Sequence, residues 1–163
     1  MKRILILLLT FLFLPMAGCA SGSNDTVTFY YCRNPEQHQF FDHNSVIHPE
    51  SRELSSHRND LKYILSLYLA GPMEEGLISP FPKNTRILSV QQAESEILIE
   101  LTDLSIAMTD SEFTLGSACL TLTCLDLTSR STITVHSGER TISMNSDNIV
   151  LSDIIPQQES SGG

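Results

Sequence analysis

Two runs at the centre of the chain decide the fold: Arg86-Ile87-Leu88-Ser89-Val90-Gln91 and Glu96-Ile97-Leu98-Ile99-Glu100-Leu101. In the second run, every other residue from Ile97 onward is apolar, while the positions between them are mixed, which is the pattern of a half-buried strand. A hairpin through residues 93–95 is the simplest connection between the two runs. The sequence therefore predicts an antiparallel hairpin at the centre of the domain.

A helix is predicted before this hairpin. Apolar residues recur every three or four positions over residues 54–69, which is the spacing of one helix face. Ser55 or Ser56 is a suitable cap for its start. Gly71 and Pro72 predict its end, because glycine can adopt the left-handed conformation that stops a helix and proline cannot continue it.

The run that follows the hairpin, residues 112–127, fits two periodicities. Its apolar positions match a helix face, but some of them also alternate as in a strand, and its threonines favour a strand. The run is long and has no turn signal, and Asp110 and Glu112 precede or open it, as acidic residues do at helix starts. We therefore predict a helix here.

Strands are predicted at both ends of the domain. Residues 26–32 are rich in β-branched and aromatic side chains, residues 131–136 alternate, and a turn at 137–139 leads to a weaker strand at 141–144. The predicted order is βαββαββ. This order is typical of an α+β two-layer sandwich, with a mostly antiparallel sheet and both helices on one face.

The N-terminus carries an export signal. Lys2 and Arg3 precede an apolar run over residues 4–14, which is too short to span a bilayer comfortably. The residues that follow, Pro15-Met16-Ala17-Gly18-Cys19, resemble the bacterial lipobox. The resemblance implies a signal peptide over residues 1–18, cleavage between Gly18 and Cys19, and a diacylglycerol on the Cys19 sulfur. Such a chain is held at the extracytoplasmic face of the cell membrane by its lipid.

The composition predicts the boundaries of the remaining segments. Residues 19–25 comprise the lipidated cysteine and a flexible linker, residues 26–151 form a single domain, and residues 152–163 form a disordered tail. After cleavage, eight basic side chains oppose nineteen acidic ones. Nucleic acid is therefore not expected as a partner, and mutual repulsion favours a monomeric isolated domain.

Three cysteines remain once Cys19 is lipidated: Cys32, Cys119 and Cys124. An odd number allows one disulfide at most. Cys119 and Cys124 are five residues apart, which fits no common zinc spacing, so we expect small buried side chains. A disulfide from Cys32 to either of the other two is the alternative.

One group of residues has the chemistry of a metal site. His38, His43 and His48 are evenly spaced, with carboxylates between them, and imidazole and carboxylate groups bind zinc or copper. A spacing of five brings residues to one face of neither a helix nor a strand, so we expect a solvated polar loop and no metal or other cofactor. His57 and His136 are expected at the surface, on the first helix and on a late strand.

No catalytic constellation is evident in the sequence. There is no Gly-x-Ser-x-Gly elbow and no serine beside a convincing base. We therefore expect that the protein is not an enzyme.

Several short motifs occur in a recognisable order: Leu69-Ala70-Gly71-Pro72, Pro82 with Thr85, Asp103-Leu104-Ser105, Leu120-Thr121-Leu122-Thr123, and Ile133-Thr134-Val135 with Gly138. Together they resemble the GerMN domain of sporulation and germination lipoproteins. The resemblance covers about residues 26–150 and implies a fold similar to ring-building motifs. It also implies a non-enzymatic assembly or scaffolding role, with envelope or spore-assembly proteins as partners. A ligand- or metal-binding envelope lipoprotein of vegetative cells is the alternative.

Zinc titrated into the mature chain is expected to give no heat of binding at micromolar concentration, because the three histidines do not converge. Isothermal calorimetry measures this directly. Heat that is lost in a His43→Ala variant would show instead that the loop folds around a metal ion.

Overall fold

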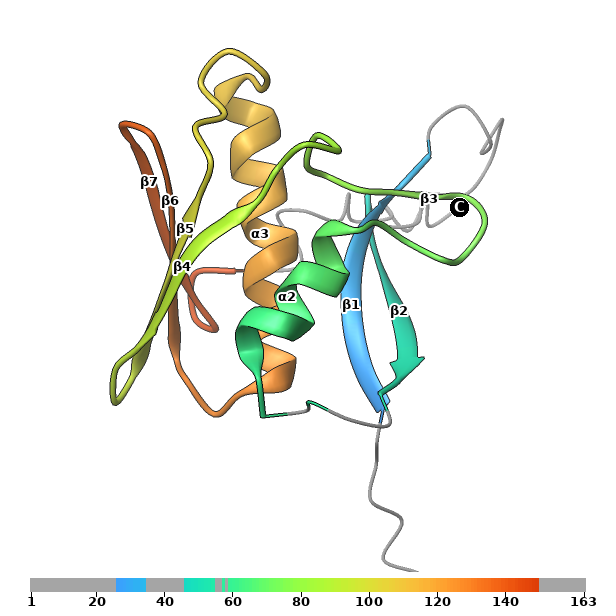
Figure 1. Ribbon diagram of the computed structural model, residues 1–163, viewed down its shortest axis with the longest axis horizontal. Helices are drawn as coiled ribbons and strands as arrows, with labels where there is room; N and C mark the ends of the chain where they lie inside the picture. The colour runs from blue at the N-terminus through green and yellow to red at the C-terminus, as the bar shows by residue number, and fades with distance from the viewer. Residues whose placement is uncertain (1–25, 35–45, 55–56, 58, 150–163) are drawn as a thin grey trace, which may run out of the picture.

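The computed structural model describes residues 26–34, 46–54, 57 and 59–149 (Figure 1). These residues form nine elements, and their order is ββαβββαββ. The elements are β1 (Thr26–Arg33), β2 (Ile47–Glu53), α2 (Leu61–Leu69), β3 (Leu77–Ile78), β4 (Ile87–Gln92), β5 (Glu96–Leu101), α3 (Asp110–Leu127), β6 (Thr132–Ser137) and β7 (Arg140–Asn145).

The strands form two sheets. One has the order β2-β1-β3 and the other the order β4-β5-β6-β7. All neighbouring strands are antiparallel except β5 and β6, which are parallel because α3 carries the chain from one end of the sheet to the other. Figure 1 shows α3 between the two sheets, with α2 on the same side of the four-stranded sheet.

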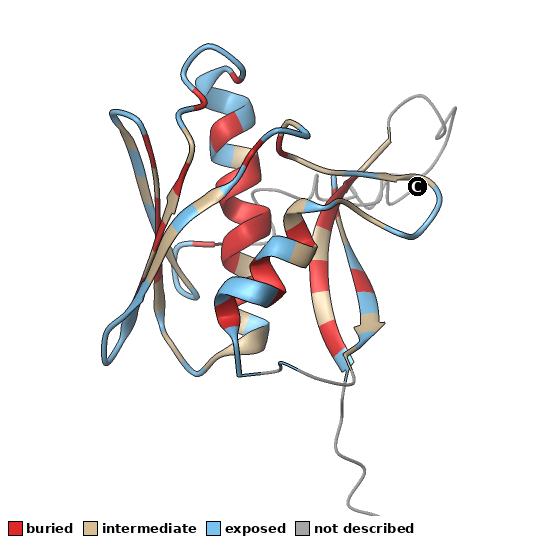
Figure 2. Cartoon of the chain, viewed as in Figure 1, coloured by how far each residue is buried: buried red, intermediate tan, exposed pale blue. Residues whose placement is uncertain are grey.

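Helix α3 is buried around its whole circumference at its centre. Six consecutive residues, Gly116–Thr121, are buried, which a helix with one solvent face cannot show (Figure 2). Its start is fixed by a capping box, in which Thr109 Oγ1 accepts the Glu112 N–H and the Glu112 carboxylate accepts the Thr109 N–H. The prediction of a helix over residues 112–127 is confirmed.

The predicted central hairpin is also confirmed. Ile97, Ile99 and Leu101 of β5 are almost fully buried, and their register partners on β6 include Ile133 and Val135, which are buried as well. This apolar face of the four-stranded sheet packs toward the helices. The α+β class, the two helices and the mostly antiparallel pairing agree with the sequence prediction.

Two details of the predicted architecture are wrong. The order βαββαββ lacks β2 and β3, and the two-layer arrangement lacks the three-stranded sheet that covers the other side of α3. Strand β2 carries Pro49 and several charged residues, which argue against a strand; it tolerates them because it lies at a sheet edge. Strand β3 has only two residues and gives no periodic signal.

The first helix begins later than predicted. Leu54 directly follows β2, and Asp60, not Ser55 or Ser56, caps α2 by accepting the Tyr63 N–H at 3.0 Å. Ser55 and Ser56 themselves lie outside the described residues. The predicted end is confirmed, because Gly71 follows the last turn with a φ of 102°.

Two side chains of β2 hold the end of α2 in place. The Glu50 carboxylate accepts the N–H groups of Met73 and Glu74 at 2.9 and 2.8 Å and also pairs with the Arg52 guanidinium. Arg52 in turn donates to the Gly71 carbonyl at 2.7 Å. The edge strand β2 therefore holds Gly71 through Arg52 and the two residues after Pro72 through the buried Glu50 carboxylate.

A second contact joins the loop after β5 to the β6–β7 turn. The buried Ser137 Oγ donates to the Thr102 carbonyl at 2.8 Å and accepts the Leu104 N–H at 3.0 Å. Gly138 has a φ of 61°, and a Cβ there would lie 2.6 Å from Asp103 Oδ1. Two stretches that are distant in sequence, 102–105 and 137–138, thus depend on one another.

The Glu50 contacts predict an acid-sensitive contribution to stability. Burial by itself raises the pKa of Glu50, but the Glu74 N–H, the Arg52 guanidinium and the Met73 N–H together hold it below its ordinary value. A carboxylate with a lowered folded-state pKa stabilises the fold above its unfolded pKa, and this contribution is lost as pH falls through the folded pKa.

We therefore expect Glu50→Gln to reduce the free energy of unfolding by about 1–3 kcal/mol at pH 7. The difference from wild type should shrink as the pH falls below the ordinary glutamate range. Urea unfolding followed by circular dichroism at several pH values measures it. The exposed Glu53→Gln is the matched control on the same strand. A Glu50→Gln difference that does not change with pH would contradict the assignment.

The close contact of Gly138 with Asp103 predicts that a side chain at position 138 destabilises the fold. Gly138→Ala should lower the free energy of unfolding by about 1–3 kcal/mol, because alanine is strained at positive φ and its Cβ must displace Asp103. Glu139→Ala, at the exposed neighbouring position, should change it by less than about 0.5 kcal/mol. Equal effects of the two substitutions in urea titrations would rule out this account of the turn.

Candidate docking groove beside helix α3

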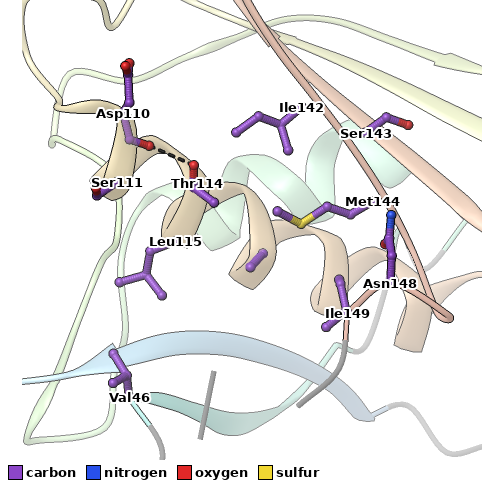
Figure 3. Close-up of a pocket in the computed structure, with 11 residues that line it drawn as sticks. Val46, Asp110, Ser111, Thr114, Leu115, Ile142, Ser143, Met144, Asn148 and Ile149 are labelled. Atoms are coloured by element: carbon purple, nitrogen blue, oxygen red, sulfur yellow. Dashed lines mark hydrogen bonds between the residues drawn. The ribbon is translucent and has the colours of Figure 1, made fainter. Parts of the chain in front are cut away.

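A hollow lies between α3 and β7. It has a volume of about 730 Å³ and is more apolar than polar in its lining (Figure 3). We call it the α3–β7 groove. Its lining residues are Val46, Asp110, Ser111, Thr114, Leu115, Ala118, Ile142, Ser143, Met144, Asn148 and Ile149.

The apolar floor of the groove follows from strand alternation at a sheet edge. Ile142 and Met144 of β7 pair with Val135 and Ile133, so they lie on the sheet face that packs toward the helices. Figure 3 shows both side chains projecting from β7 toward α3, with Leu115 across the groove. Because β7 is an edge strand, these side chains are only half-buried.

The rim of the groove is polar and partly acidic. Asp110 lies at the start of α3 with its side chain 96% exposed, and its backbone carbonyl accepts the Thr114 hydroxyl at 2.8 Å. Arg140 Nη1 lies 3.6 Å from Asp110 Oδ1, while the guanidinium packs 4.5 Å from the centre of the Phe113 ring. The described lining thus offers aliphatic surface with a carboxylate beside it, which is suited to holding an apolar side chain.

Sequence reasoning did not identify this groove. The strand over 141–144 was predicted, and its alternation places Ile142 and Met144 on one face. What it does not show is that β7 is the edge of the sheet or that Leu115 of α3 lies opposite. These depend on the strand order, which the sequence pattern alone does not specify.

Of the three histidines considered as metal ligands, only His48 lies in the described residues. Its Nδ1 is 3.1 Å from Arg33 Nη2, and its Nε2 is 3.9 Å from Glu74 Oε1. Arginine can only donate, so His48 Nδ1 accepts and the proton is on Nε2. Both ring nitrogens therefore already face protein groups. His38 and His43 lie outside the described residues, as do Gly18 and Cys19.

The other histidines are placed as follows. His136 is on β6 and half-buried. His57 is exposed, but it precedes α2 instead of lying on it, with a φ of 65° and its ring 4.7 Å from that of Tyr63. No group of three or more His, Cys, Asp or Glu residues within the described ranges is arranged to hold a metal ion. Neither described helix is long and apolar enough to cross a membrane.

All three described cysteines are buried, as expected, and they are free thiols in this structure. Burial raises the pKa of Cys124 to about 12. The sulfur atoms of Cys32 and Cys119 lie 3.9 Å apart.

The architecture is that of an α+β module with its long helix between two sheets. Among solved structures it is similar to the tandem GerMN domains of the sporulation protein GerM from Bacillus subtilis, with a TM-score of 0.53 and 16% identity over 71% of this chain and 39% of that one. It is also similar to the first GerMN domain of that protein, with a TM-score of 0.51 and 14% identity over 71% of this chain and 86% of that one. The chain thus spans well under half of the tandem-domain structure.

A third similar structure is a candidate lipoprotein from Clostridium perfringens, with a TM-score of 0.46 and 15% identity over 75% of this chain and 87% of that one. No protein-family model matches the sequence. No curated protein matches it either. The chain has a GerMN-like fold, as the sequence motifs predicted.

Proposed function

We propose that this chain is a membrane-anchored, extracytoplasmic lipoprotein that acts as a non-enzymatic assembly module connected with sporulation or spore germination. The observation that carries the proposal is the fold likeness to GerMN domains of a sporulation protein. The lipobox-like run ending at Cys19 supports the location, since a lipid on that sulfur would hold the domain at the membrane surface.

The α3–β7 groove is the surface that we propose for the partner. Its floor is aliphatic, its rim carries the exposed Asp110, and the mature chain has eight basic against nineteen acidic side chains. Charge complementarity favours a partner segment in which an apolar side chain fills the groove and lysine or arginine flanks it. The proposed occupant is such a segment of another envelope protein.

A ligand-binding envelope lipoprotein of vegetative cells is the second candidate. The volume of the groove favours it, because small-molecule sites commonly measure about 300–1,000 Å³. A thermal-shift screen separates the two proposals. A small molecule that raises the melting temperature supports the receptor, whereas a purified partner that does so supports the assembly module.

Cell fractionation tests the lipid anchor. In fractionated cells, the wild-type chain is expected in the membrane fraction, and it should be accessible to protease added outside the cell membrane. Cys19→Ala should release it from that fraction, because the thioether cannot form. A variant that fractionates like wild type would contradict the anchor, and Cys124→Ala serves as the control for loss of a thiol alone.

A substitution at Leu115 tests the groove as the partner surface. Leu115→Glu should reduce capture of the partner by cross-linking in sporulating cells about tenfold or more, since one buried leucine contributes about 1.5–3 kcal/mol. Leu88→Glu is the matched control, because Leu88 is 52% exposed on β4, away from the groove. Circular dichroism establishes that both variants fold.

Equal capture by the two variants would exclude the groove as the partner surface. Capture of wall-synthesis or transport proteins in growing cells would move the function to vegetative cells. Stronger capture after truncation behind Ile149 would show that the C-terminal residues compete for the groove.

A further inference from the structure

Two cysteines from different layers of the fold meet in the core. Cys32 comes from β1 and Cys119 from the middle of α3, and their sulfur atoms are 3.9 Å apart. Cys119 is fully buried and Cys32 is 5% exposed. Within the described part of the chain, this is the pair that brings two sulfur atoms into contact.

The strand and the helix are held in this alignment by bonds that do not involve sulfur. The Tyr30 N–H of β1 donates to Thr123 Oγ1 of α3 at 3.0 Å, and Thr123 Oγ1 donates to the Cys119 carbonyl at 3.0 Å. Thr123 lies one helical turn from Cys119 on α3, and Tyr30 lies two residues from Cys32 on β1. The approach of Cys32 to Cys119 is therefore fixed by the packing of β1 on α3.

Cys124 provides an internal comparison. It lies on the same helix and is fully buried, but it has no such sulfur neighbour among the described residues. If any buried thiol could be oxidised, Cys124 would enter a disulfide as readily as Cys119. If a disulfide forms only between sulfur atoms that the fold brings into contact, the Cys124 thiol stays free.

We propose that Cys32 and Cys119 form a disulfide in the exported chain, so that this pair is a redox modification site that joins β1 to α3. The sulfur atoms need to approach from 3.9 Å to about 2.05 Å, within the reach of small side-chain and backbone shifts. In the cell, the proposal rests on the extracytoplasmic location proposed above, because protein disulfides persist in oxidising compartments.

The oxidant is a disulfide, either of a thiol–disulfide oxidoreductase or of oxidised glutathione. The two thiols are equivalent before they pack in the core, so their roles in this step can be exchanged. Cys32 loses its proton to solvent and attacks as a thiolate. Its sulfur bonds to one oxidant sulfur and releases the other as a thiolate. Cys119 then loses its proton and attacks Cys32 Sγ, which releases the second oxidant thiolate. Two electrons and two protons pass in total to the oxidant and solvent.

The bond must form while the chain folds, because neither thiol is open to an oxidant once β1 has packed on α3. It would close the long loop between residues 32 and 119. A cross-link of this length restricts the unfolded chain strongly and so favours the folded state.

The test is refolding of the full chain in detergent. The chain carries Cys19→Ser, so that three thiols remain, and it is unfolded with reductant and refolded in a buffer of oxidised and reduced glutathione. We expect two of the three thiols to become resistant to alkylation and peptide mapping to join Cys32 to Cys119. The melting temperature of the oxidised form should exceed that of the reduced form.

Substitutions supply the controls. Cys124→Ser should still form the bond, whereas Cys32→Ser should keep its thiols free and melt at the same temperature with and without reductant. Three free thiols in the refolded Cys19→Ser chain, or a bond to Cys124, would overturn the proposal, and neither result requires a substitution in the core.

Alkylation of thiols in intact cells tests the location separately. Free Cys32 and Cys119 in membrane-anchored chain outside the cell would overturn the disulfide proposal and leave the anchor intact. Free thiols in chain found in the cytosol would contradict the proposed location, and the refolding result would then decide whether the pair can form the bond.

Discussion

The structure depends on one packing constraint, which is that helix α3 has no solvent face at its centre. Sheets lie on both sides of it, so the helix needs small or apolar side chains around its whole circumference. Gly116 shows how tight the fit is, because a Cβ there would lie 3.0 Å from the Phe81 ring. The same constraint makes β5 and β6 parallel, since the chain crosses between them through this buried helix. Glu50 and Arg52 then fix α2 against the edge strand β2.

The parts of the fold that could be predicted from sequence are those with a strong local pattern. The alternation of β5, the Gly-Pro end of α2 and the acidic start of α3 each have a single physical reading once length is considered. Strand β2 could not be predicted in the same way. Its Pro49 and its charges argue against a strand, and they are tolerated only because the strand lies at an edge and its buried carboxylate finds partners on the loop after α2.

The candidate site was less predictable than the fold, and the reason is topological. The α3–β7 groove exists because β7 ends the sheet, which leaves Ile142 and Met144 half-covered opposite Leu115. Alternation along β7 shows that Ile142 and Met144 share a face, but no local pattern shows that β7 is the edge strand of its sheet. For the same reason, the contact of Cys32 with Cys119 could be considered from sequence only as one of two pairings of Cys32, whereas the packing of β1 on α3 brings these two together.

The motifs that carry the family resemblance do structural work at the ends of elements. Gly71 ends α2 and accepts from Arg52, and Gly138 turns against Asp103. Residues of this kind specify how a chain turns and where its layers meet, and none of them is a reactive group. The fold itself is shared with GerMN domains at 14–16% identity. Residues that bind a partner must lie elsewhere, on surfaces that the architecture leaves open. In the described part of this chain, the α3–β7 groove is such a surface, because its floor can change without altering either turn.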